Sequence, residues 1–79
     1  DIEPFRLSAC VPLTDSVRQG RLVNRSGYTN PDPARFDTRF FECPDSYEIR
    51  SVPRAGGGTI VHEIDKATGG VRVEERPAQ

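Results

Sequence analysis

The chain has 79 residues, 34% of them apolar, and a formal net charge of −1. A chain of this length forms one domain, residues 1–79, with one thin core. A charge so close to zero gives no global field for nucleic acid or an anionic membrane, and no apolar run is long enough to cross a bilayer. We therefore expect no nucleic-acid partner and no membrane insertion.

The first predicted element is a strand at Phe5–Val11, where every second side chain is apolar. This alternation is typical of a strand with one buried face. Pro12 is expected to end the strand.

A short helix is expected next, because Thr14 or Asp15 can cap its first turn. Glycine commonly follows the last residue of a helix, so we expect Gly20 to stop this one after two turns at most. The following Arg21–Asn24 is a candidate short strand.

The segment from Arg25 to Phe36 is rich in turn-forming residues and is expected to be a loop. Asp32 can cap a single helical turn that has Pro33 at its first position. A loop of this length in so small a domain is either pinned by a side chain such as Tyr28 or functional.

The second half predicts four more strands. They lie at Thr38–Cys43, Tyr47–Val52, Thr59–Ile64 and Val71–Glu75. The last two flank a glycine-containing turn and form the clearest hairpin signal in the chain. The expected fold is mostly β: a small antiparallel sheet or sandwich of five to six short strands with at most one short helix, stapled by one disulfide.

The residues Tyr47–Ile49 and Thr59–Val71 resemble the closing hairpin of PepSY-type extracytoplasmic domains. In that family a strand ends in an Asp-x-x-Thr-Gly turn, which Asp65–Gly69 matches, before a strand that opens with valine. The similarity covers less than a third of the chain, and the long helix that precedes the hairpin in that family is missing. The resemblance implies a hairpin and an extracytoplasmic location.

Cys10 and Cys43 are the only cysteines. A bond between them closes a loop of about 34 residues, which in the chain-entropy model stabilises the fold by roughly 3.8 kcal/mol. The alternative is two buried free thiols in a cytoplasmic protein. Their spacing fits neither a redox C-x-x-C motif nor a zinc site, and one histidine cannot complete a ligand set, so we expect no metal or other cofactor.

The bond also bears on location, because disulfides persist in oxidising compartments. The chain begins at Asp1 rather than methionine. This fits a secreted or periplasmic protein whose signal peptide is removed before Asp1, or equally a shortened chain.

Three motifs could carry chemistry. His62 could act as a general base, but Glu63 would point to the opposite face of a strand and could not orient it. The glycine run at Ala55–Thr59 has no lysine or following helix for a phosphate and is expected to be a hairpin loop. Asn24–Ser26 matches the N-glycosylation pattern, which matters only in a eukaryotic secretory pathway.

The expected function is therefore protein binding: a non-enzymatic extracytoplasmic module, an accessory or structural subunit of a larger assembly. The alternatives are a secreted or periplasmic inhibitor of a hydrolase, and a small enzyme that uses His62. The partner would be another protein or a second copy, with no small-molecule substrate expected. Tyr and Arg are enriched in binding hot spots, and the candidate protein-binding residues are Tyr28, Asp32, Arg35, Phe36, Arg39, Arg50 and Arg54.

Overall fold

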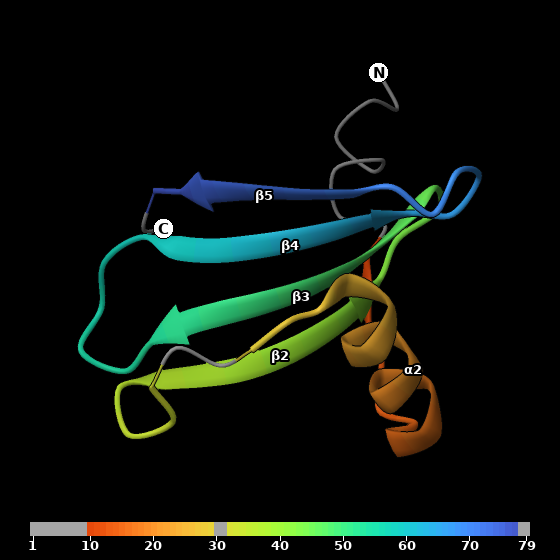
Figure 1. The fold of residues 1–79 in the computed structure, drawn as a ribbon. Coiled ribbons are helices and arrows are strands. Elements are labelled where there is room, and N and C mark those ends of the chain that lie inside the picture. The colour runs from red at the N-terminus through yellow and green to blue at the C-terminus, as the bar shows by residue number, and fades with distance from the viewer. Residues whose placement is uncertain (1–9, 30–31, 78–79) are drawn as a thin grey trace.

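The fold is an antiparallel sheet with a helix on one face, seen in a computed structural model that describes residues 10–29 and 32–77. The five strands are hydrogen-bonded in the order β1-β2-β3-β4-β5, so each strand pairs with its neighbour in the chain (Figure 1). The mostly-β prediction with one short helix and one disulfide is confirmed. The elements are β1 (Val11–Pro12), α2 (Ser16–Ser26), β2 (Phe36–Glu42), β3 (Ser46–Pro53), β4 (Thr59–Asp65) and β5 (Val71–Arg76).

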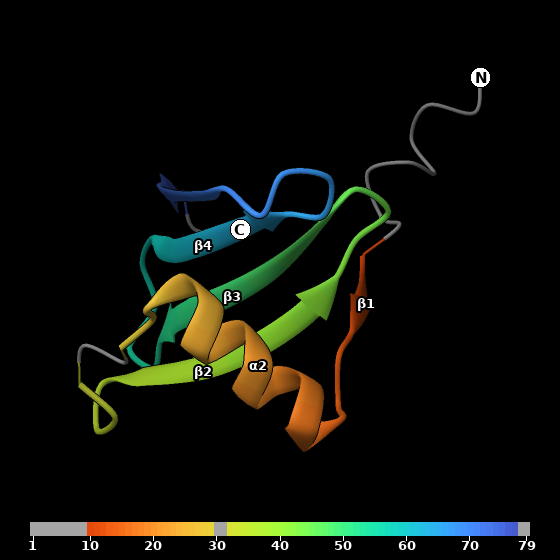
Figure 2. The ribbon, with the colours of Figure 1, turned by 45° about the vertical axis from the view of Figure 1, so that its right-hand side comes forward.

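The N-terminal edge of the sheet is the short strand β1, which lies alongside β2 (Figure 2). Val11 pairs with Glu42 and Pro12 with Phe41. Most of the predicted strand Phe5–Val11 lies outside the described residues. Pro12 does not end the strand as predicted but belongs to it, which an edge position allows because proline there need not donate to a ladder.

Helix α2 begins where the sequence predicts, but the glycine that ends it lies seven residues beyond the predicted stop at Gly20. The Asp15 side chain caps it by accepting a hydrogen bond from the Val17 amide at 2.9 Å. Gly20 does not stop the helix, and the predicted strand at Arg21–Asn24 is helical. The residue that ends the helix is Gly27, whose left-handed φ of 68° lets its amide bond the Val23 carbonyl.

Burial explains why the helix continues past Gly20. Leu22 packs into the core beneath the helix, together with residues of β3 and β4. Ending the helix at Gly20 would withdraw this side chain from the sheet, so tertiary packing overrides the local stop signal. The buried cluster comprises Leu13, Leu22, Tyr28, Ile49 and Ile64, with Val23, Phe40 and Tyr47 packed against it.

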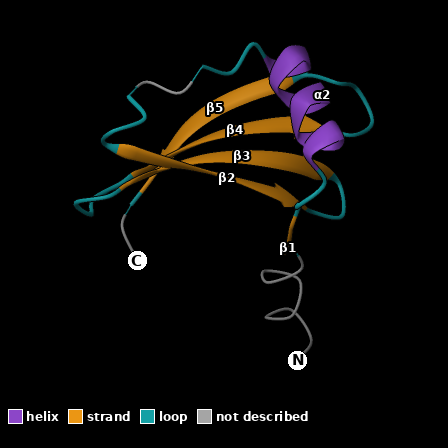
Figure 3. Cartoon of the chain, turned by 90° about the horizontal axis from the view of Figure 1, so that it is seen from below, coloured by secondary structure: helices purple, strands orange, loops and turns teal. Residues whose placement is uncertain are grey.

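The strand registers place one row of residues across the helix-covered face. Phe40 pairs with Ile49, Ile49 with His62, and His62 with Val73. The predicted hairpin between β4 and β5 is confirmed, with Gly69 at a φ of 76° in its turn. Helix α2 covers this face only at the end where β3 begins and β4 ends (Figure 3).

Tyr28 anchors the segment after the helix to the sheet, which is one of the two alternatives that the sequence left open for this loop. Its hydroxyl lies 2.8 Å from Ser51 Oγ and 2.9 Å from Thr38 Oγ1, and its ring is buried in the core. Because Ser51 is itself fully buried, the contact satisfies a hydroxyl that has no access to water.

The predicted disulfide between Cys10 and Cys43 is present, with a Cα–Cα distance of 4.1 Å. It joins the residue before β1 to the residue after β2. No helix in the described part of the chain is long and apolar enough to cross a membrane.

Candidate functional site

A groove of about 770 Å³ opens between α2 and the end of the sheet beside the β4–β5 turn. Its apolar lining comes from core side chains and from the ring of Tyr47. Four of its ten lining residues are cationic and one is anionic. The lining residues are Leu13, Arg18, Arg21, Leu22, Asn24, Arg25, Tyr47, Ile64, Asp65 and Lys66.

The helix supplies three of the four cations. Arg18, Arg21 and Arg25 are spaced three and four residues apart, which places them along one side of a helix. Arg25 lies against the β4–β5 turn: a Cβ built on Gly69 would be 2.8 Å from Arg25 Nη2. Because glycine occupies that position, the guanidinium group can lie close to the turn backbone.

One end of the groove is fixed by a cluster around Glu42. Arg18 Nη2 donates to Glu42 Oε1 and to the Tyr47 hydroxyl, both at 3.3 Å. Lys66 Nζ donates to Glu42 Oε2 at 3.0 Å and lies 4.9 Å from the centre of the Tyr47 ring. The hydrogen bond from Lys66 lowers the pKa of Glu42 despite partial desolvation, so the carboxylate stays charged and holds both cations in place.

The other end of the groove has uncompensated positive charge. Among residues 10–29 and 32–77, neither Arg21 nor Arg25 lies within 4.0 Å of a carboxylate oxygen. Both side chains belong to exposed residues. The groove therefore offers two guanidinium groups that are free to bind an anion.

The opposite face of the sheet is also rich in arginine, but there the charges are paired. Each arginine on that face forms an ion pair with a carboxylate of the same or the adjacent strand, and Arg76 of β5 also reaches Glu48 of β3 across β4. The pairs are Arg39–Asp37, Arg50–Glu48, Arg76–Glu48, Arg76–Glu74 and Arg72–Glu63. Among the described residues, every arginine of this face is therefore in an ion pair, whereas Arg21 and Arg25 of the groove are not.

His62 lies on the helix-covered face, and in the part of the chain that the structure describes no carboxylate forms an ion pair with its ring. Its ring packs edge-on against Tyr28 with 5.0 Å between centroids, and burial lowers its pKa. Its Nδ1 is buried and hydrogen-bonds to no described group. Glu63 points to the opposite face, where it pairs with Arg72, as the strand alternation predicts.

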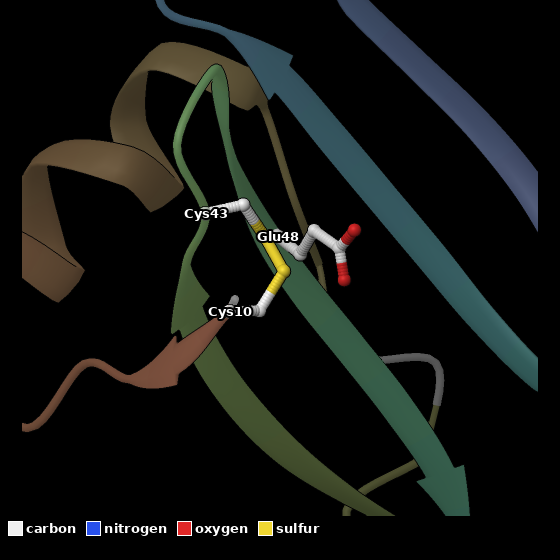
Figure 4. A group of neighbouring side chains, drawn as sticks. All are labelled: Cys10, Cys43 and Glu48. Atoms are coloured by element: carbon white, nitrogen blue, oxygen red, sulfur yellow. A yellow bond between two sulfur atoms is a disulfide. The ribbon is translucent and has the colours of Figure 1, made fainter. Parts of the chain in front are cut away.

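One group of potential metal ligands occurs in the described residues: Cys10, Cys43 and Glu48, whose ligand atoms lie within 4.8 Å of one another (Figure 4). The disulfide consumes both thiolates. Glu48 is already bound by Arg50 and Arg76. With these bonds formed, the donor set does not suit a metal ion.

The sequence-predicted binding residues do not converge on one site. Tyr28 is buried in the core. Asp32 accepts a hydrogen bond from the Ala34 amide in the turn before β2, and the Arg54 amide donates to the Arg35 carbonyl. This group, with Phe36 at the start of β2, lies at the end of the sheet away from the groove. Arg39 and Arg50 belong to the opposite face, in the ion pairs given above.

The groove residues were missed for a definite reason. The spacing of Arg18, Arg21 and Arg25 is a helical signal, but a helix that stops at Gly20 assigns Arg21 to a strand and Arg25 to a loop. Their common face is visible only once the helix is known to continue to Ser26.

Comparison with known proteins finds no matching family model, no similar curated protein and no similar solved structure. The likeness to PepSY-type domains is therefore confined to the hairpin residues that suggested it.

Proposed function

We propose that the chain is a non-enzymatic protein-binding module that works outside the cytoplasm as an accessory or structural subunit of a larger assembly. The Cys10–Cys43 disulfide suits an oxidising compartment. The single observation that carries the proposal is the groove, where an apolar floor is bordered by arginine and lysine. Protein interfaces typically combine an apolar centre with a polar rim and are enriched in Tyr and Arg.

Exposed apolar side chains extend this surface along β5. Val71 and Val73 are 42% and 57% exposed, and both lie on the face that α2 covers elsewhere. Val71 pairs with Ile64, which lines the groove, so the valines continue the groove floor toward the edge of the sheet. A partner seated in the groove would cover them as well.

Site-specific photocrosslinking tests this proposal. A photoreactive amino acid at Asn24, an exposed groove residue, should link the chain to a partner protein or a second copy in its native source. The control position is Ala34, which is exposed in the turn before β2 and should give no product. No product at Asn24, or equal products at both positions, would contradict docking in the groove.

The inhibitor alternative has one observation in its favour, an anchored loop after β3. The Arg54 amide donates to the Arg35 carbonyl at 2.8 Å, and Arg54 Nη2 donates to the Pro33 carbonyl at 3.2 Å. Inhibitors bind with little backbone rearrangement, which a tethered loop favours. A crosslink from the exposed Ala55 to a hydrolase, with none from Asn24, would favour this alternative over the subunit.

A further inference from the structure

We propose that the groove binds a short acidic segment of the partner protein in extended conformation, with its carboxylates on Arg21 and Arg25. This inference rests on the proposed function and adds the chemical class of the partner. It is drawn from the charge balance, the spacing and the apolar floor of the groove.

The charge balance favours an anion over a neutral peptide. Arg21 and Arg25 have no carboxylate within 4.0 Å among the described residues, whereas the arginines of the opposite sheet face are paired. Guanidinium groups form bidentate hydrogen bonds to carboxylates, and these are stronger than bonds between neutral groups. A carboxylate that enters the groove therefore displaces no existing ion pair of Arg21 or Arg25.

The spacing of the arginines matches an extended chain. Arg21 and Arg25 are four residues apart, which is about 6 Å along the helix axis. Side chains two residues apart in an extended peptide point the same way and are separated by about 6.6 Å. Two acidic residues separated by one other residue can therefore meet the two arginines one to one.

The floor of the groove favours a peptide over a nucleic acid or a free phosphate. Leu22 and Ile64 form part of it, and the Tyr47 ring is held by Arg18 and Lys66. This surface can accept an apolar side chain next to the acidic residues, which a phosphate backbone lacks. The chain's net charge of −1 also gives no long-range attraction for a polyanion. The preferred segment is acidic with apolar residues interspersed.

A labelled peptide tests the inference directly. Fluorescence anisotropy with the oxidised full chain and a fluorescein-labelled Glu-Leu-Glu-Leu-Glu peptide should show saturable binding that weakens as the salt concentration rises above about 0.1 M. The matching Gln-Leu-Gln-Leu-Gln peptide should bind at least about tenfold more weakly, because it lacks the charges.

Two double variants separate the groove from general electrostatics. Arg21→Gln/Arg25→Gln should weaken binding of the acidic peptide by about tenfold or more. Arg35→Gln/Arg39→Gln removes the same charge from exposed residues outside the groove and should leave the affinity within about twofold. Circular dichroism should show both variants folded, because all four side chains belong to exposed residues.

Three results would overturn the inference. The first is no binding of the acidic peptide, and the second is equal weakening of its binding by both double variants. The third is a single-stranded oligonucleotide of the same charge that binds more tightly than the peptide and loses affinity in Arg21→Gln/Arg25→Gln. These results are distinct from failure of the proposed function. A partner crosslinked from Asn24 that lacks an acidic segment would leave the docking module standing and remove only the acidic ligand.

Discussion

At Glu48 a carboxylate is buried on the sheet face that no described helix covers. The residue is 5% exposed, and its oxygens accept hydrogen bonds from Arg50 and Arg76. Desolvation raises the pKa of this carboxyl, but the hydrogen bonds from Arg76 and Arg50 outweigh it and the net pKa is lowered. The two arginines thus replace the water that the carboxylate loses on folding.

Replacing Glu48 by glutamine should lower the free energy of unfolding at neutral pH by about 2 kcal/mol, because two arginines lose a charged acceptor. A lowered pKa means that the folded state binds the proton less readily than the unfolded state. The contribution of Glu48 is therefore full above its ordinary pKa of 4.5 and is lost as the pH falls through the lowered value. Urea unfolding at several pH values measures both effects.

Glu63→Gln is the matched control, because it removes the ion pair with the mostly exposed Arg72, while the amide oxygen of glutamine can still accept the hydrogen bond from Ser46 Oγ. Its cost should be about 0.5 kcal/mol or less. Equal costs for the two variants would show that burial of Glu48 does not matter to stability.

At the scale of elements, the strands were easier to predict than the helix. Alternating apolar residues and turn glycines sufficed for β4 and β5, because both signals are local. Asp15 was also readable as the start of α2. The end of α2 was not, because Gly20 and Gly27 are both candidate stops, and the choice between them depends on the packing of Leu22 against the sheet.

Gly20, inside α2, and Gly27, directly after its last residue, should respond to alanine substitution with opposite changes in stability. Gly20→Ala should raise the free energy of unfolding by about 0.8 kcal/mol, because alanine favours the helix and the new Cβ has no atom within 4 Å. Gly27→Ala should lower it by about 1 kcal/mol, because alanine is strained at a φ of 68°. Urea unfolding of the pair measures both. Destabilisation by Gly20→Ala would place the helix end at Gly20 after all.

The residues that line the candidate groove were harder to predict from the sequence than the end of the helix. Its cations come from α2 and from the β4–β5 turn, and its aromatic ring from β3. Which of them meet depends on how the helix lies across the sheet, and no local pattern encodes that angle. Tyrosine and arginine are residue types suited to an interface, but the tyrosine chosen from the sequence was Tyr28, whose ring is buried in the core.

At the scale of the whole molecule, the disulfide is a covalent cross-link between the edge strand β1 and the rest of the sheet. Cys10 precedes β1, a strand of two residues, and Cys43 follows β2. The buried cluster of the described residues is small for a domain, so a covalent tie contributes a large share of the net stability.

Cys10→Ser/Cys43→Ser should lower the free energy of unfolding by about 3.8 kcal/mol, the chain entropy restored to the unfolded state by opening the loop. A reductant should shift the urea midpoint of the native chain toward that of the variant and should not affect the variant itself. Thiol titration of the denatured, unreduced protein should find no free thiol. Two reactive thiols would contradict both the bond and the oxidising compartment inferred from it.

The consecutive order of the strands also governs how the chain reaches its structure. Strands β2 to β5 pair only along successive hairpins, which are local contacts of the kind associated with fast folding. Hairpins form within about 1–10 μs, whereas disulfide formation takes seconds to hours. Hairpin pairing should therefore precede oxidation, because Cys10 meets Cys43 only when β1 pairs with β2 across the intervening helix. The disulfide then stabilises a strand order that hairpin pairing has already established.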